Sequence, residues 1–397
     1  MAGHPPITPL DRFTDEPVRF DLASISALLL WGKARSASDI ALTSGEPVWM
    51  RIHGEWFPVT QRRLQVGELH EVLSAMSRED SAAAQVQSGK DYDFAFEFTE
   101  NRTSRHRFRC NATACRHGYQ VGMEIVVRTI PEVPPALSEM GLEDDPGLFE
   151  ALFPRFGLVI VTGPVGSGKT TFLAATLRDI LTNPPGRHIM TYEAPVEFDL
   201  TAIPNRRGLV IQSEVPQHLP SFNVAPRNSL RRAGDVVLYG EVRDAETIRN
   251  MTTQAETGVA VYCTAHTNSV SETISRMVRE FAWQERDGIQ AGLIAALRLI
   301  VHQRLLPCAN GGRVAVREYL PFDETIRRLL IDTPTQELIP TCQRMVEQHG
   351  RTLIDDIGIK HQQGRISADE LAQMTALYRR QHDHSSPTSS PTEACND

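Results

Sequence analysis

The pattern of hydrophobic and polar positions changes near residue 148, and the two parts of the chain predict different folds. Before this position, several segments alternate between apolar and polar residues. After it, short continuous apolar runs are separated by stretches of helical period. Alternation is typical of strands with one buried face, whereas continuous apolar runs between helices are typical of buried parallel strands. The pattern predicts an antiparallel N-terminal sheet with helices on one side, followed by a mainly parallel α/β sheet.

Two neighbouring segments, 91–98 and 105–112, show the alternation most clearly. The first places aromatic side chains on one face and acidic ones on the other: Tyr92, Phe94, Phe96 and Phe98 against Asp91, Asp93 and Glu97. The second places arginines on one face: Arg105, Arg107 and Arg109. The polar residues between the segments suit a hairpin loop. A helix over 24–34, two strands within 38–56 and a strand over 123–130 complete this part.

The second half predicts four strands and two long helices in alternation. The strands are 158–163, 188–193, 235–240 and 259–265, and the helices are 169–182 and 245–257. Taken together, these patterns divide the chain into a flexible arm 1–18, an N-terminal domain 19–130, a linker 131–147, an α/β domain 148–330, a helical region 331–380 and a disordered tail 381–397.

The composition is that of a globular protein and argues against several functional classes. Of the 397 residues, 41% are hydrophobic and 23% are charged, and the net charge is −8. A negative net charge, without a stripe of alternating basic and aromatic residues, argues against stable nucleic-acid binding. The chain shows neither a signal peptide nor an apolar run of the ~18 residues that a membrane span needs. We therefore expect a cytoplasmic protein without membrane insertion, and its scattered cysteines predict no zinc or redox site.

An eight-residue glycine-rich segment, GPVGSGKT at 163–170, carries the strongest chemical signal. It lies between a predicted strand and a predicted helix, where backbone N–H groups and the helix N-terminus can hold phosphate. Lys169 would reach the β- and γ-phosphate oxygens, and the Thr170 hydroxyl would bind Mg²⁺. The predicted ATP-binding residues are Gly163, Pro164, Val165, Gly166, Ser167, Gly168, Lys169, Thr170 and Thr171.

Two glutamates at predicted strand ends are candidates for the hydrolytic chemistry. Glu241 follows the strand ending at 240 and would act as general base; the alternative is an ion pair with Arg243. Gly240 stands where many related motifs carry an aspartate. If its strand is adjacent, Glu193 would approach the same nucleotide and contact Mg²⁺ through water. Glu197, across Pro195 from Glu193, is interpreted as a solvated or structural residue.

His266 closes a fourth strand and has two interpretations. At the carboxyl edge of the sheet it could sense the γ-phosphate through a hydrogen bond. Equally, it could be a buried histidine with its hydrogen bonds satisfied.

Four segments in order resemble the traffic ATPases of type II and type IV secretion and of type IV pili. GPVGSGKTT resembles their Walker A loop and MTYEAPVEF their Asp box. SLRRAGDVVLYGEVRDAETI resembles the Walker B region and AETGVAVYCTAHTNS the His box. The resemblance extends over roughly residues 35 to 330, since the N-terminal segments RFRCNA and VVRTIP also match.

The resemblance implies a cytoplasmic homohexamer docked on inner-membrane machinery, with ATP and Mg²⁺ as ligands. Each subunit would combine a PAS-like N-terminal α+β domain with a RecA-like α/β ATPase domain. Glu241 would be the general base, Glu193 would assist through Mg²⁺ or water, and His266 would couple the nucleotide state to neighbouring elements. Arginines of the N-terminal sheet would contact the phosphates, with Arg107, Arg109 and Arg128 as candidates. The alternative is that the acidic face of the 91–98 strand pairs across the hairpin with the arginine stripe.

Departures from the family pattern narrow the resemblance to one branch. Ala194 replaces the aspartate that usually follows the Asp-box glutamate, and the cysteine-rich module of type II members is absent. These features are most similar to the DotB/TraJ branch, which serves type IVB secretion and plasmid conjugation. Pilus retraction motors are the second candidate because TIRRLLI at 325–331 is similar to a segment of theirs. A RecA-like nucleic-acid motor and a nucleotide-binding module without turnover are further alternatives.

Overall fold

The computed structural model describes residues 12–52, 55–100, 105–130, 133–142, 145–242, 244–309 and 311–383. By their packing the residues form two compact units. The first contains residues 1–133 together with 197–202, and the second contains the rest. The predicted tail beyond 383, residues 1–11 of the predicted arm, and parts of the linker lie outside the described residues.

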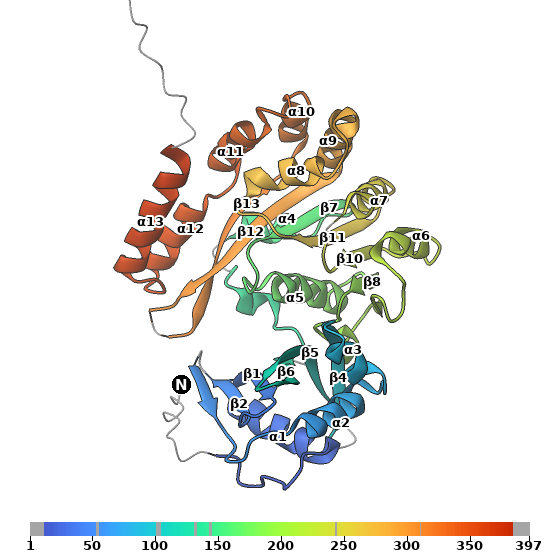
Figure 1. The fold of residues 1–397 in the computed structure, drawn as a ribbon. Helices are drawn as coiled ribbons and strands as arrows, with labels where there is room; N and C mark the ends of the chain where they lie inside the picture. Colours follow the sequence, from blue (N-terminus) through green and yellow to red (C-terminus); the bar gives the residue numbers. More distant parts are fainter. Residues whose placement is uncertain are drawn as a thin grey trace, which may run out of the picture. The chain divides into compact units, whose positions relative to one another are not determined.

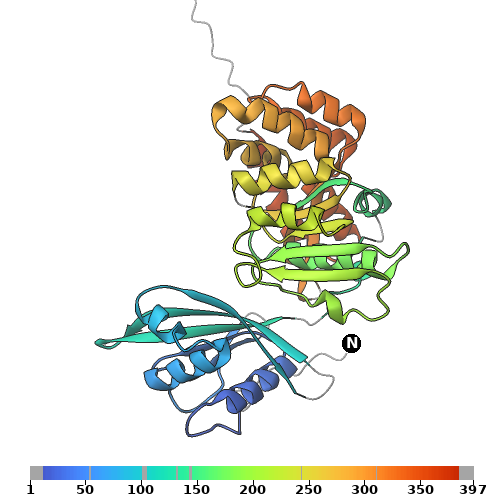
Figure 2. The same ribbon diagram turned by 90° about the vertical axis from the view of Figure 1, so that its right-hand side faces the viewer.

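The first unit is a six-stranded antiparallel sheet covered on one face by three helices (Figures 1 and 2). Its strand order is β3-β2-β1-β6-β5-β4. The strands are β1 Ala37–Thr43, β2 Trp49–Ile52, β3 Glu55–Pro58, β4 Tyr92–Thr99, β5 Arg105–His117 and β6 Gln120–Ile130. The helices are α1 Leu22–Ala34, α2 Val66–Ser77 and α3 Ala82–Gln87. This confirms the predicted antiparallel sheet with helices on one side, while the PAS-like label stays a prediction.

The alternating segments pair in the register that their faces require. Glu97 lies opposite Arg107 and Phe96 opposite Phe108, so the aromatic face enters the core and the charged face lies outside it. One detail differs from the predicted loose arm. Phe13 is buried in this core and stacks edge-on against Trp31, because an apolar ring gains more from burial than the short segment loses in freedom.

The second unit is built on a seven-stranded sheet of order β13-β12-β7-β11-β10-β8-β9. All neighbours are parallel except the β12–β13 pair. Its strands are β7 Gly157–Thr162, β8 His188–Glu193, β9 Leu209–Glu214, β10 Val236–Tyr239, β11 Ala260–Ala265, β12 Leu297–Pro307 and β13 Arg313–Pro321. The mainly parallel sheet is confirmed; β9, β12 and β13 are not among the predicted strands.

Helices cover both faces of this sheet and continue beyond it. They are α4 Pro146–Ala151, α5 Lys169–Thr182, α6 Ala225–Leu230, α7 Ala245–Glu256, α8 Val270–Arg279, α9 Arg286–Ala296, α10 Glu324–Ile331, α11 Leu338–His349, α12 Leu353–Gln362 and α13 Ala368–Asp383. Its short 3₁₀ turns are η1 Leu137–Met140, η3 Phe222–Val224 and η4 Trp283–Glu285, whereas η2 Leu200–Ala202 belongs to the first unit. The predicted helical region after 331 is confirmed.

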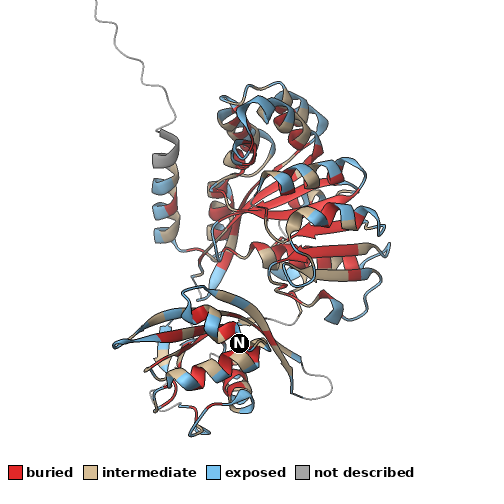
Figure 3. Cartoon of the chain, turned by 45° about the vertical axis from the view of Figure 1, so that its right-hand side comes forward, coloured by how far each residue is buried: buried red, intermediate tan, exposed pale blue. Residues whose placement is uncertain are grey.

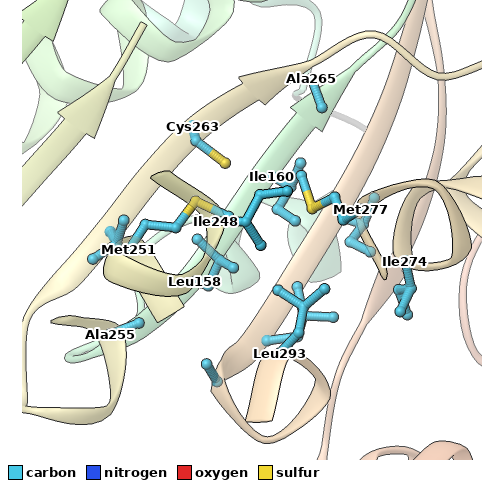
Figure 4. Packing of buried hydrophobic residues seen from close by; sticks show 14 of the residues in the cluster. Leu158, Ile160, Ile248, Met251, Ala255, Cys263, Ala265, Ile274, Met277 and Leu293 are labelled. Atoms are coloured by element: carbon cyan, nitrogen blue, oxygen red, sulfur yellow. The ribbon is translucent and has the colours of Figure 1, made fainter. Parts of the chain in front are cut away.

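The core of the second unit explains why its strands are continuous apolar runs. Every residue of β7 and β11 is buried (Figure 3). Leu158 and Ile160 of β7 pack with Ile248 and Met251 of α7 on one face (Figure 4). Because successive strand residues point to opposite faces, Val159 and Val161 are directed to the other face, where α5 lies. A sheet covered on both sides exposes its strand ends, and the functional candidates lie there.

Candidate nucleotide-binding site

The glycine-rich segment forms a loop that joins the end of β7 to the start of α5. Gly163, Gly166 and Gly168 have φ values of +142°, +76° and +81°, in a region that other residues rarely adopt. A Cβ atom at Gly163 would lie 2.2 Å from the carbonyl oxygen of Gln303, and one at Gly168 would lie 3.1 Å from its Nε2 atom. The glycines are therefore required both by the backbone conformation and by close contact with β12.

The chemical groups of this loop fit a phosphate. Lys169 is 7% exposed, and its Nζ donates hydrogen bonds to the carbonyl oxygens of Gly163 (2.9 Å) and Pro164 (3.0 Å). The buried Ser167 hydroxyl has no hydrogen-bond partner within the described part of the chain. A buried hydroxyl without a partner costs free energy, which a bound anionic oxygen would relieve. The N-terminus of α5 adds a favourable dipole.

Glu193 and Glu241 follow neighbouring strands. β8 and β10 are adjacent and parallel, with Tyr192 opposite Tyr239, so both glutamates lie at one edge of the sheet. Glu193 is 5% exposed and accepts hydrogen bonds from Thr191 Oγ1 (2.6 Å) and Gln212 Nε2 (3.2 Å). These bonds fix the orientation of its carboxylate.

Glu241 contacts the histidine that follows β11. His266 Nε2 lies 3.2 Å from Glu241 Oε1, and the two side chains are 37% and 24% exposed. His266 is thus half-buried, which disagrees with the interpretation of a fully buried histidine. The alternative partner of Glu241, Arg243, lies outside the described residues. The structure brings Glu241 and His266 together because β10 and β11 are adjacent.

Gly240 leaves space for Glu193. A Cβ at this position would lie 3.2 Å from the Cα and 3.4 Å from the Cγ of Glu193. The distance to Cα is tighter than ordinary contact, so a larger residue would press on the backbone of Glu193. The glycine that replaces an expected acid therefore makes close approach of Glu193 possible.

Several buried polar residues at this edge were not found by sequence reasoning. Thr267 donates its backbone N–H to Thr162 Oγ1 at 2.9 Å, and the two hydroxyls are hydrogen-bonded to each other. This contact fixes the segment after His266 to the last residue before the phosphate loop. Thr162 ends an apolar run directly before the glycine-rich motif, and that position was the signal available in the sequence.

Two buried titratable residues belong to β12 and β13. Burial lowers the pKa of His302 to about 4 and raises the pKa of Glu318 to about 7. The Glu318 carboxylate accepts a hydrogen bond from the backbone N–H of Val270 at 2.7 Å, at the start of α8. In the sequence, Glu318 lies in an apolar run without a motif.

The three candidate arginines have acidic partners in the first unit. Arg107 lies 3.8 Å from Glu97, Arg109 lies 3.6 Å from Glu197, and Arg128 lies 2.8 Å from Asp39. The predicted alternative, pairing with the acidic face of the 91–98 strand, agrees with the contact of Arg107 alone, because Glu197 and Asp39 lie outside that strand. The contact with Arg109 also gives Glu197 the structural role expected for it.

The described residues contain no cluster of three or more His, Cys, Asp or Glu side chains suited to a metal ion. Mg²⁺ takes few protein ligands and keeps several waters, so a hydroxyl and one carboxylate are a sufficient protein contribution. In the described part of the chain, no helix is both long and apolar enough to cross a membrane.

The phosphate loop and the strand-end acids define a P-loop nucleotide-binding protein of α/β class. The chain belongs to the type II/IV secretion system protein family, whose model matches residues 32–390. Relatives in this family are ATPases of secretion and pilus systems.

Three relatives illustrate the match. The type IV pilus retractation ATPase PilT of Pseudomonas aeruginosa is 34% identical over 321 residues, which cover 80% of this chain and 88% of PilT. The crystal structure of the ATPase DotB of Legionella pneumophila is 39% identical with a TM-score of 0.80, covering 91% of this chain and 98% of that one. The pilus retraction motor PilT with bound ADP is 29% identical with a TM-score of 0.73, covering 89% and 97%.

Proposed function

We propose that this protein hydrolyses ATP with Mg²⁺ to power a secretion or transfer machine. The observation that carries the proposal is the convergence of four elements at one edge of the sheet: the phosphate loop, Glu193, Glu241 and His266. The loop residues 163–171 would bind the phosphates, with Lys169 at the β- and γ-oxygens. Thr170 would hold Mg²⁺, which would offset the negative charge of the phosphates.

Glu241 is proposed as the general base that orients and deprotonates water. Its hydrogen-bonding distance to His266 means that a change at the nucleotide that moves Glu241 would also move the segment after β11. Because that segment continues directly into α8 at Val270, His266 is proposed to couple nucleotide state to α8. Glu193, held by Thr191 and Gln212, would contact Mg²⁺ through water.

The candidate arginines divide by exposure. Arg107 is 12% exposed beside Glu97, and we assign it to the stability of the first unit. Arg109 and Arg128 are 37% and 61% exposed, and both stay candidates for a phosphate contact.

The machine that we propose is a type IVB secretion or conjugative transfer system, with the protein working as a cytoplasmic homohexamer docked at the inner membrane. The Ala194 form of the Asp box and the 39% identity to DotB support this proposal. Pilus retraction is the second candidate. The curated relatives favour it, because PilT matches over most of both chains, and α10 carries the retraction-like segment TIRRLLI.

Purified protein tests the chemistry directly. We expect Mg²⁺-dependent phosphate release from ATP and a hexamer in sedimentation with nucleotide. A strict monomer under these conditions would contradict the ring. Strong stimulation of turnover by single-stranded DNA would instead favour a nucleic-acid motor.

A gene deletion in the native host separates the two machines. Restored substrate export or plasmid transfer by the wild-type gene, and not by Glu241→Gln, would support the first candidate. Restored pilus retraction with unchanged export and transfer would support the second.

A further inference from the structure

Gln303 of β12 holds the phosphate loop from two sides. Its side chain donates from Nε2 to the carbonyl oxygen of Ser167 at 2.7 Å, and its backbone carbonyl lies against Gly163. Gln303 is 1% exposed, so water does not compete for these contacts. One residue therefore touches both ends of the loop that is proposed to bind phosphate.

Arg317 of β13 determines which way the Gln303 amide points. Its Nε donates to Gln303 Oε1 at 2.8 Å, so the amide nitrogen must face Ser167. If the amide turned over, its oxygen would face the Ser167 carbonyl and both hydrogen bonds would be lost. The guanidinium also stacks on Phe172 of α5, with Cζ 4.6 Å from the ring centroid.

Arg317 is in turn fixed by elements outside the nucleotide site. Its Nη2 donates to the carbonyl oxygen of Met140 in η1 (2.8 Å), and its backbone N–H donates to Asp356 of α12 (2.9 Å). Lys360 of α12 donates to the adjacent carbonyl of Gly141 at 3.2 Å. A chain of buried hydrogen bonds thus runs from the phosphate loop through β12 and β13 to α12.

We propose that Gln303 and Arg317 are positioning residues that set the conformation of the phosphate loop and tie it to the C-terminal helix α12. This inference rests on the proposed nucleotide function for its effect on ATP. Its structural part, the coupling of loop and helix, does not. Neither residue needs to touch the nucleotide, because each acts on the loop backbone.

Nucleotide affinity tests the first part. Gln303→Met keeps volume and removes the donor to Ser167, and we expect binding of a fluorescent ADP analogue to weaken about tenfold. Arg317→Met should weaken binding as well. The double variant should match Gln303→Met alone, because both changes break the same chain. Unchanged binding in Gln303→Met, or losses that add in the double variant, would overturn the proposal.

Hydrogen–deuterium exchange without nucleotide tests the second part. Gln303→Met should raise exchange of the amides of residues 163–170. Asp356→Ala, on α12, should raise exchange in the same loop segment. Unaltered loop exchange in both variants would overturn the coupling. If the wild-type protein binds no nucleotide, while Gln303→Met and Asp356→Ala still raise exchange in the loop, the proposed function is contradicted and the coupling is supported.

Arg313→Met is the matched control, since Arg313 lies on the same strand and is exposed. It should change neither affinity nor exchange. If Arg317→Met does not fold, as judged by thermal unfolding, Gln303→Met and Asp356→Ala still decide the proposal.

Discussion

The charged residues of the two sheets are used in different ways. On the outer face of the first unit, Glu97 lies across from Arg107 and accepts two hydrogen bonds from Arg105. At the carboxyl edge of the second unit, Glu193 and Glu241 follow adjacent parallel strands, and Thr191, Gln212 and His266 are among the residues that they contact. Antiparallel register places opposite charges side by side, whereas parallel strands bring their ends together at one edge.

This difference indicates where charge serves stability and where it serves chemistry. An exposed cross-strand ion pair contributes little free energy and nothing to catalysis. Acids at the common edge of parallel strands lie where an α/β sheet binds ligands. We expect substitutions at the carboxyl edge of the second unit's sheet to change ATP turnover greatly. Substitutions on the outer face of the first unit should change the free energy of unfolding only slightly.

The largest effect is expected for Glu241→Gln. Loss of the general base should lower ATP turnover by about 100-fold or more, while nucleotide binding is kept. Phosphate release and fluorescence titration measure the two properties. Glu256→Gln, on the exposed side of α7, is the control and should retain turnover. Full turnover in Glu241→Gln would remove the main contrast between the two sheets.

A smaller loss is expected for Glu193→Gln. The amide can still accept the hydrogen bonds from Thr191 and Gln212, so folding should be preserved. Without its charge, we expect turnover to fall about tenfold and the Mg²⁺ concentration for half-maximal rate to rise. Unaltered Mg²⁺ dependence would show that Glu193 is a structural residue like those of the first sheet.

Glu318 gives a pH-dependent effect on stability. Burial raises its pKa from 4.5 to about 7 in the folded protein. Between these values the unfolded chain binds fewer protons than the folded one, so this group makes the free energy of unfolding fall as pH rises. Glu318→Gln should remove this contribution. Denaturant unfolding of both proteins from pH 4.5 to 7.5 measures the difference, which should grow with pH and level off above about 7.

The smallest effect is expected on the first sheet. Arg107→Gln should lower the free energy of unfolding by less than about 1 kcal/mol, because its ion pair with Glu97 is partly exposed. Turnover should stay within about twofold of wild type. A tenfold loss of turnover at unchanged stability would place Arg107 at the nucleotide and break the comparison.

Much of the fold follows from local pattern. The helix 169–182 and the strand 188–193 agree with the prediction at both ends. The reason is that glycines before Lys169 and continuous apolar residues before Glu193 are signals within a few positions. The hairpin of β4 and β5 was predictable for the same reason, since alternation fixes which side chains face the core.

The β12–β13 pair was harder to predict. Its residues His302, Gln303, Arg317 and Glu318 are polar or charged within apolar runs, and each is 3% exposed or less. A polar residue in such a run has no periodic signal that identifies its partner, because the partner is distant in sequence. Gln303 and Arg317 are 14 residues apart, and Gln303 and Ser167 are 136 apart.

The sequence by itself determined the strand–loop–helix unit of the phosphate loop, the strands that end at Glu193 and Tyr239, and the alternating faces of the first sheet. These depend on backbone conformations and side-chain periods that neighbouring residues specify. Only the tertiary structure decided that β10 lies between β8 and β11, which joins Glu241 to His266. It also decided that Gln303 and Arg317 connect the phosphate loop to α12, since buried polar groups take partners according to strand order.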